Sequence, residues 1–277
     1  MDTFGIAYRP ALAASVFEQR AQIDVLEVIA DDYFGAGKRE LAALALLGRH
    51  MPTRVHAVSL GLATCARVDM ARVYALARVV DAAGSGVWSE HLAFVRAGGI
   101  ELGHLCAPPR TPATLEGLAR NVARARRVIG SAPALENVAT LIDPPCSELD
   151  EAAFVRCALE LADAPLLLDL HNLHANARNF DWDPIAYLDT LPLSRVRSVH
   201  LAGGRLFQGR VLDDHQHAVP EPVYTLLEAL AARVSQPLEV IVERDGRPPP
   251  LHVYLAELAR ARLAVTRGRA QQLERSA

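Results

Sequence analysis

The sequence lacks the features that mark several specialised classes of protein. Cysteine is scarce, with four residues in 277, and no pair has the CxxC spacing of a thiolate metal site or a redox motif. No apolar run approaches the roughly 20 residues of a membrane span, and the N-terminus has neither the basic start nor the apolar stretch of a signal peptide. We therefore expect a cytoplasmic protein with no membrane anchor and no disulfide framework. The cysteines are expected to be small core or loop residues: Cys65, Cys106, Cys146 and Cys157.

An excess of positive charge is also missing. The formal net charge is −3 and the pI is about 6.4, so the chain lacks the excess of positive charge that is typical of proteins that bind nucleic acid. Hydrophobic residues make up 51% of the sequence and charged residues 22%, which is typical of a globular protein with an ample core. Because no linker or shift in composition divides the chain, we expect a single domain.

Short apolar or β-branched runs recur along the whole chain and predict eight strands. Longer amphipathic stretches lie between them. A strand and a helix repeated eight times predict an α/β fold of the (β/α)₈ TIM-barrel type, here over residues 1–267, followed by a flexible tail at 268–277. The runs lie at residues 4–9, 24–29, 53–60, 86–92, 134–138, 165–172, 196–203 and 238–245.

The stretch at 111–130 shows the helical pattern clearly. Thr111 or Thr114 can cap its start, Gly130 stands where a helix ends, and its apolar residues recur at helical spacing. The alternative architecture, an open doubly wound sheet, usually has a glycine-rich nucleotide-binding turn after its first strand. The corresponding segment here, "GIAYRP", has one glycine, so the barrel is preferred.

Polar side chains gather at the C-terminal ends of the predicted strands, where barrel enzymes carry their functional groups. In the run "LLLDLHNLH", for example, three leucines lead directly into Asp169, His171 and Asn172. Residues far apart in sequence would therefore meet at one mouth. The other strands, or the loops after them, supply Glu27, Asp32, His56, Glu90, His91, Glu136, Asn137, His200, Asp213, His215, His217, Glu243 and Asp245.

Taken singly, these residues have structural interpretations. A histidine at a strand end is commonly a hydrogen-bonded core residue, and Glu136 or Glu243 could pair with an arginine such as Arg54 or Arg244. The coincidence of three histidines, two glutamates and one aspartate at six strand ends instead predicts a metal centre. Other polar residues are expected to be structural, as loop or helix-start histidines or as caps and turn formers: His104, His174, His252, Asp143 and Asp183.

The expected donor set favours manganese, iron or zinc, because carboxylates combined with imidazoles suit hard or borderline cations. A catalytic zinc site needs only three protein ligands, whereas the sequence offers about nine candidates. More than one ion is therefore expected, and Glu136 could bridge two ions at the spacing of about 3.5–4 Å found in two-metal sites.

Together these segments resemble the multinuclear non-heme iron-dependent oxidative enzymes (the MNIO family), whose fold is similar to that of xylose isomerase. The matching motifs follow the family's order over nearly the entire chain. They are "HAVSLGL" (56–62), "SEHLAF" (89–94), "ENV" (136–138), "LLLDLHNLHANARN" (166–179), "VHLAGG" (199–204), "DDHQHAVP" (213–220) and "ERDG" (243–246).

The resemblance implies two or three iron ions in mixed ferrous and ferric states, with dioxygen as co-substrate. The expected catalytic residues are Glu136, Asp169, His200 and Glu243. These four, with His56 and His91, would hold a central pair of ions. A third, more labile ion would be held by Asn172, Asp213 and His215. Groups that orient the ligands would be Glu90, Asn137 and Asp245.

The resemblance also implies the reaction. Members of the family use dioxygen to modify ribosomally made peptides, most often at cysteine, in natural-product (RiPP) biosynthesis. By analogy, one iron would bind the substrate thiolate while a neighbouring ferrous ion activates dioxygen. Members generally work with a separate partner protein that recognises the leader region of the precursor peptide, and we expect such a partner here.

This chain departs from the family pattern in three places. His171 stands where the family often has the first of two asparagines, Asp31-Asp32-Tyr33 replaces a common Glu-Asn-Tyr, and Tyr8 follows a first strand with little glycine. We expect these changes to leave the metal ligands intact and to affect the substrate and the product. Tyr8 is expected to project towards the mouth.

Two other functions fit parts of the pattern. A zinc-, manganese- or magnesium-dependent hydrolase or isomerase of the xylose isomerase or endonuclease IV type would share the barrel and its mouth, but the negative net charge counts against DNA as a substrate. A barrel that binds a ligand without chemistry is disfavoured, because the set of candidate ligands is complete. Metal content and colour, with and without air, would separate an iron enzyme from the first alternative.

Overall fold

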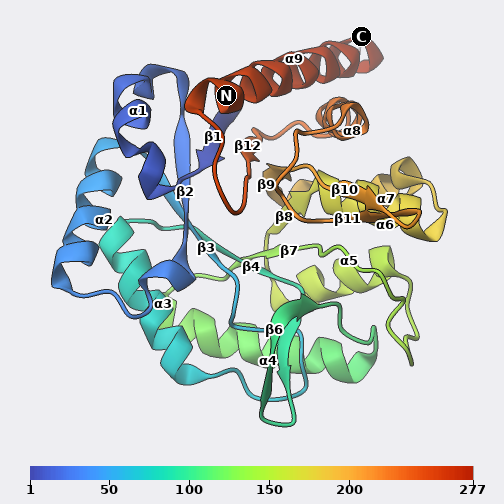
Figure 1. The fold of residues 1–277 in the computed structure, drawn as a ribbon. Coiled ribbons are helices and arrows are strands. Elements are labelled where there is room, and N and C mark those ends of the chain that lie inside the picture. The colour runs from blue at the N-terminus through green and yellow to red at the C-terminus, as the bar shows by residue number, and fades with distance from the viewer. Residues whose placement is uncertain (277) are drawn as a thin grey trace. The chain divides into compact units, whose positions relative to one another are not determined.

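Eight parallel strands close into a barrel in the computed structural model, which describes residues 1–276 (Figure 1). The order of neighbouring strands is β1-β12-β9-β8-β7-β4-β3-β2. This confirms the (β/α)₈ prediction, although each strand is shorter than the apolar run that predicted it. The barrel strands are β1 (Thr3–Ala7), β2 (Val25–Ile29), β3 (Thr53–Ala57), β4 (Trp88–His91), β7 (Ala134–Glu136), β8 (Leu166–Asp169), β9 (Val196–Leu201) and β12 (Glu239–Val242).

Helices alternate with the strands, and several have the ends that the sequence predicts. The Thr111 side chain accepts a hydrogen bond from the Thr114 N–H at the start of α4, and Gly130 ends that helix with a φ of 95°, a conformation that favours glycine. Asp183 caps α7 through the Ile185 N–H. The α-helices are α1 (Ala13–Glu18), α2 (Lys38–His50), α3 (Met70–Ala83), α4 (Pro112–Ile129), α5 (Glu151–Ala162), α6 (Leu170–Phe180), α7 (Pro184–Thr190), α8 (Glu221–Ala231) and α9 (Leu251–Ser276). No helix within residues 1–276 has both the length and the apolar character needed to cross a membrane.

Contacts within the chain group it into two compact units. The central unit runs from Glu27 to Leu167, and the terminal unit combines Met1–Leu26 with the chain from Leu168 onward. In the central unit, β3, β4 and β7 pair in parallel, and α2, α3, α4 and α5 pack in succession. Trp88 on β4 is buried in this core, where its ring N–H donates to the Ser131 carbonyl at 3.1 Å.

Asn121 on α4 ties the loop after β3 to that helix. Its side chain is buried, and its amide donates to the carbonyls of Leu62, Thr64 and Ala66 at 2.9–3.3 Å. Its oxygen accepts from the Val68 N–H at 3.0 Å. One side chain therefore satisfies four main-chain groups of an irregular segment, which would otherwise be costly to bury.

In the terminal unit, β1 pairs with β12 and β12 with β9, while α8 packs against α9. Helix α9 includes residues 268–276, which the sequence suggested as a flexible tail. Arg269 in this segment pairs with Asp2 at 2.6 Å and donates to the Gln236 carbonyl at 2.7 Å. Ala277 of the expected tail lies outside the described residues. The domain boundary at 267 stays a prediction.

Two antiparallel hairpins add to the barrel pattern and have no counterpart among the predicted strands. One pairs β5 (Phe94–Ala97) with β6 (Ile100–Cys106), and the other pairs β10 (Arg205–Phe207) with β11 (Arg210–Leu212). Both turns use residues with positive φ, at positions 98–99 and 208–209, as two-residue hairpin turns require. Because β6 and β10 are largely exposed, they lack the apolar signal of a core strand.

Candidate metal centre

The central unit brings two histidines onto one carboxylate. His56, His91 and Glu136 stand at or next to the C-terminal ends of β3, β4 and β7. Glu136 Oε2 lies 3.6 Å from His56 Nε2 and 3.4 Å from His91 Nε2. All three residues are buried, and strand pairing places His91 directly beside Glu136. We call these three residues the central cluster.

Two polar residues of β4 orient the central cluster. Ser89 Oγ lies 2.8 Å from Nδ1 of His56, which turns the opposite edge of that ring, with Nε2, towards Glu136. Glu90 is completely buried and accepts hydrogen bonds from the main-chain N–H groups of His91 and Leu60, both at 3.0 Å. Burial raises the pKa of Glu90, while the neighbouring His91 acts in the opposite direction. Glu90 therefore fixes the backbone at His91, and its role in orienting a metal ligand stays a prediction.

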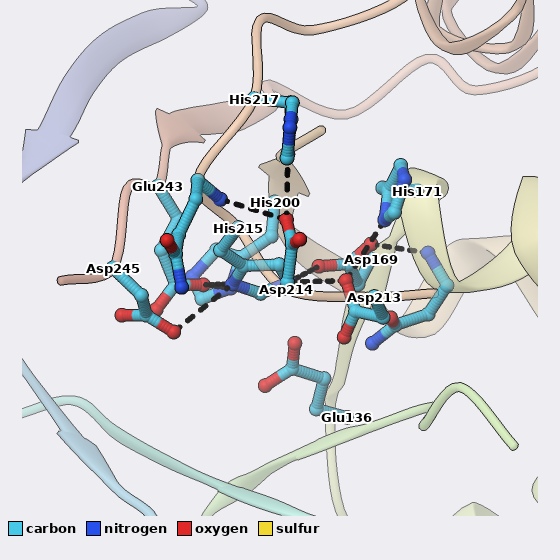
Figure 2. Close-up of polar contacts among 12 residues, drawn as sticks. Glu136, Asp169, His171, His200, Asp213, Asp214, His215, His217, Glu243 and Asp245 are labelled. Carbon is cyan, nitrogen blue, oxygen red and sulfur yellow. Dashed lines mark hydrogen bonds and ion pairs between the residues drawn. The ribbon is translucent and has the colours of Figure 1, made fainter. Parts of the chain in front are cut away.

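A second group, the terminal cluster, lies in the terminal unit (Figure 2). Glu243 Oε2, just after β12, lies 3.2 Å from Nδ1 of His200 on β9 and 3.3 Å from Nδ1 of His215. The Nε2 atom of His215 lies 2.7 Å from Asp213 Oδ1 and 4.0 Å from Asp169 Oδ2. The complete cluster is Asp169, His171, His200, Asp213, His215 and Glu243.

The run "LLLDLHNLH" changes from strand to helix at Asp169. Strand β8 ends there, and the Asp169 side chain caps α6 by accepting from the Asn172 N–H at 2.7 Å. The predicted strand at 165–172 therefore runs three residues too far, because an aspartate that caps a helix ends the strand. As a result, His171 and Asn172 project from the first turn of a helix whose start is fixed by Asp169.

The loop after β11 holds His215 in a strained conformation. His215 has a φ of 51°, in the left-handed region that is uncommon for residues other than glycine. Its carbonyl accepts from the Asp245 N–H at 2.9 Å, which ties the loop to the end of β12. Backbone conformations of this kind persist where the surroundings impose them and cluster at functional sites.

Charges in the terminal cluster are strongly paired. Burial alone would lower the pKa of His215, but the Glu243 and Asp213 carboxylates raise it well above its usual range. Burial alone would raise the pKa of Glu243, but His215 and His200 hold it well below its usual range. Burial alone would raise the pKa of Asp213 too, but His215 and His171 lower it. The cluster thus keeps its carboxylates ionised, as ligands of a cation must be, whereas His215 would release its proton when it binds one.

The donor atoms of both clusters fit a first-row metal. Bonds of about 2.1 Å to imidazole nitrogen and carboxylate oxygen place neighbouring donors about 3–3.5 Å apart, and the separations above are 2.7–3.6 Å. Within the two clusters, three sets of three such atoms lie within 4.8 Å of one another. Imidazole with carboxylate suits iron, manganese or zinc, and the four cysteines take no part in these sets within the described chain.

Several supporting residues were missed by sequence reasoning. Arg9 donates to Asp245 at 2.8 Å, and Asp245 lies 3.7 Å from Nδ1 of His215. Arg244, considered above as a partner for Glu243, instead donates to Glu257 at 2.5 Å. The same Glu257 oxygen accepts from the Val219 main chain at 3.0 Å. These partners are distant in sequence, so no local pattern identifies them.

The other candidate residues have simpler surroundings. His217 is exposed and pairs with Asp214 at 2.9 Å, and His174 is half-buried on α6. Asp31 accepts from the Val58 N–H at 2.9 Å, and Asp32 follows it in the 3₁₀ segment Ala30–Tyr33. Burial raises the pKa of Tyr8. That Tyr8 projects towards the mouth stays a prediction.

A pocket in the central unit begins next to the central cluster. Asn137 and Val138, the two residues after Glu136, line it together with side chains of α5 such as Phe154 and Val155. Most of the lining is apolar, and Arg110, Thr140 and Glu151 add polar groups.

Comparison with known proteins now identifies the family. The family model described as "RiPP precursor modification enzyme MbnB/TglH/ChrH" matches residues 3–266. The chain belongs to this family. The match confirms the resemblance drawn from the motifs. The MbnB/TglH/ChrH class is a class of metal-dependent enzymes, and the clusters described above could hold metal ions.

Curated relatives of this MbnB/TglH/ChrH family member have the general name UPF0276 protein. One from Streptomyces avermitilis is 39% identical over 252 residues, which cover 88% of this chain and 51% of the relative. The chain thus spans about half the length of that relative. Another, from Caulobacter vibrioides, is 30% identical over 269 residues and 96% of each chain.

Solved structures similar to this family member share its barrel. L-ribulose 3-epimerase has a TM-score of 0.66 at 14% identity, over 100% of this chain and 99% of that chain. Endonuclease IV from Thermus thermophilus has a TM-score of 0.59 at 18% identity, over 93% of this chain and 99% of that chain. At these identities the likeness shows the fold alone.

Proposed function

We propose that this protein is a dioxygen-dependent multinuclear iron enzyme that modifies a ribosomally synthesised precursor peptide at cysteine. The observation that carries the proposal is the presence, in a RiPP-modification family, of two largely buried clusters in which imidazoles converge on carboxylates. A single catalytic metal needs only three protein ligands. The number of converging donors supports more than one ion.

The proposed ligands follow the family resemblance. The central pair of ions would be held by His56, His91, Glu136, Asp169, His200 and Glu243. A third ion would be held by Asn172, Asp213 and His215. Distances within each cluster support parts of these sets, because His91 with Glu136, His200 with Glu243, and His215 with Asp213 already lie at the separations of a coordination shell.

Bound iron would supply the binding of the thiolate and the one-electron chemistry with dioxygen. The residues of this chain orient the ligands and shield them from water. Ser89 sets the ring of His56, Glu90 fixes the backbone at His91, and Arg9 holds Asp245 beside His215. Such partners keep ligands in one geometry and tune the metal that they hold. Burial of the central cluster, and of Asp169, His200 and Glu243 in the terminal cluster, would limit the access of bulk water.

The substrate would be a peptide with a cysteine that reaches the metals. We further propose that a separate partner protein recognises the leader region of the precursor. Tight binding of the leader by this chain alone would contradict that part of the proposal.

The remaining alternative is a zinc-, manganese- or magnesium-dependent hydrolase or isomerase, which the fold would also accommodate. Membership of a peptide-modification family counts against it. Co-expression with a short cysteine-containing peptide encoded nearby, together with its partner protein, tests the choice. We expect a defined change in the peptide mass that requires iron. An unchanged peptide with an iron-loaded enzyme would contradict the proposal.

A further inference from the structure

Asp213 lies between two imidazoles (Figure 2). Its Oδ1 atom is 2.9 Å from Nδ1 of His171 and 2.7 Å from Nε2 of His215. The two rings are nearly perpendicular, at 81°, with centroids 6.2 Å apart. One donor atom from each of the three residues lies within 4.8 Å of the other two. Three metal-binding atoms therefore converge on one small volume.

The ring of His171 is fixed in this orientation by Gly204. A Cβ atom at position 204 would lie 2.7 Å from Cε1 and 3.0 Å from Nε2 of His171, so the ring packs directly on glycine backbone. His171 is buried, with 1% of its surface exposed, whereas the Asp213 side chain keeps 22% exposure. The imidazole thus presents Nδ1 to a carboxylate that remains accessible to an entering ion.

The family resemblance alone left His171 without a role, because it replaces an asparagine and the third ion was assigned to Asn172, Asp213 and His215. We propose that His171 binds that third ion directly through Nδ1. The site would then contain two histidines and one carboxylate from this chain, besides the Asn172 amide that the resemblance implied. Two histidines with one carboxylate are typical of non-heme ferrous sites that keep open positions for other ligands. The inference rests on the proposed iron enzyme and adds a ligand specific to this sequence.

A second role for His171 would be to donate a hydrogen bond to Asp213 from outside the coordination shell, as carboxylate ligands commonly require. The two roles predict different structures. As a ligand, Nδ1 would bond the iron at about 2.1 Å. As a hydrogen-bond donor, Nδ1 would keep its proton and its contact with Asp213, and the ion would lie beyond bonding distance.

The deciding experiment is a crystal structure of the full chain loaded with ferrous iron without air, with anomalous scattering at the iron edge. We expect an iron peak bonded to His171, Asp213 and His215. A peak farther than about 3 Å from His171 Nδ1, or no peak beside these three residues, would overturn the proposal.

The iron affinity of matched variants gives a second readout. His171→Ala should bind the third iron more weakly than the unmodified protein, and His171→Asn, which keeps a hydrogen-bond donor but lacks the imidazole, should do so too. His174→Ala, on the same helix and outside the cluster, should keep the full affinity. An unchanged affinity for the third iron in His171→Asn would overturn direct ligation. These measurements need no peptide, so a failure of peptide modification would reject the proposed function and leave this site standing.

Discussion

The hydroxyl oxygen of Ser89 lies 2.8 Å from Nδ1 of His56, across neighbouring strands β3 and β4. Loss of this contact frees the imidazole to rotate away from Glu136. We expect Ser89→Ala to weaken metal binding by about 10-fold or more, the effect of removing a partner that orients a ligand. Competition with a coloured chelator measures it.

Ser85→Ala is the matched control for this substitution, because Ser85 is also buried and its hydroxyl bonds to the nearby main chain of Val87. Its metal affinity should equal that of the unmodified protein. Equal affinities in the Ser89 and Ser85 variants would show that Ser89 does not orient His56.

Removal of metal should destabilise the fold. Each cluster buries carboxylates against imidazoles, and a cation that binds only the folded protein adds to its stability by mass action. The melting temperature should fall after chelation under anaerobic conditions and recover on addition of ferrous iron. An identical melting curve before and after chelation would mean that these residues bind no ion that stabilises the fold.

Arg244 and Glu257 form a buried ion pair that also holds the Val219 main chain. Glu257→Ala leaves a buried guanidinium without its carboxylate, and we expect a loss of about 3–5 kcal/mol in the free energy of unfolding. The double variant Arg244→Met with Glu257→Leu should lose less, because no charge is left unpaired. Urea unfolding measures both; a double variant less stable than Glu257→Ala would contradict this explanation.

Gly204 is a position where added volume should disturb His171 directly. A Cβ there meets the Leu212 carbonyl at 2.0 Å as well as the ring. We expect Gly204→Ala to cost about 1–3 kcal/mol of stability through overpacking. Gly35→Ala is the control, since a Cβ at that position meets nothing within 4 Å. Similar unfolding curves for the two variants would contradict the close packing.

The contact between Asp2 and Arg269 should depend on pH. Burial opposes ionisation, but the bonds from Arg269 hold the pKa of Asp2 below its usual value of 3.8. The carboxylate form is the stabilised one, so its contribution is complete above pH 3.8 and is lost as the pH falls through the lowered pKa. Asp2→Asn should therefore lower the melting temperature at neutral pH and have a smaller effect at lower pH. A pH-independent difference would show that charge is not responsible.

The fold could be predicted from the sequence because apolar runs and amphipathic stretches alternate along it. The candidate ligands could be predicted because barrel strands deliver their C-terminal residues to one end. Asp169 illustrates the limit, since its capping of α6 moved His171 and Asn172 from a strand to a helix. The packing of His171 on Gly204 and the pairing of Arg9 with Asp245 join distant segments. No spacing in the sequence encodes such contacts, and the exposed hairpins lack a core pattern.

The most direct measurement of the central claim is the peptide mass after a reaction with defined metal and gas. The full chain is prepared without air, loaded with iron or with zinc, and mixed with its precursor peptide and partner protein before dioxygen is admitted. The iron enzyme should change the peptide mass only after dioxygen is added, and the zinc enzyme should leave it unchanged. Modification by the zinc enzyme, or by the iron enzyme without dioxygen, would contradict the assignment of an oxidative iron centre.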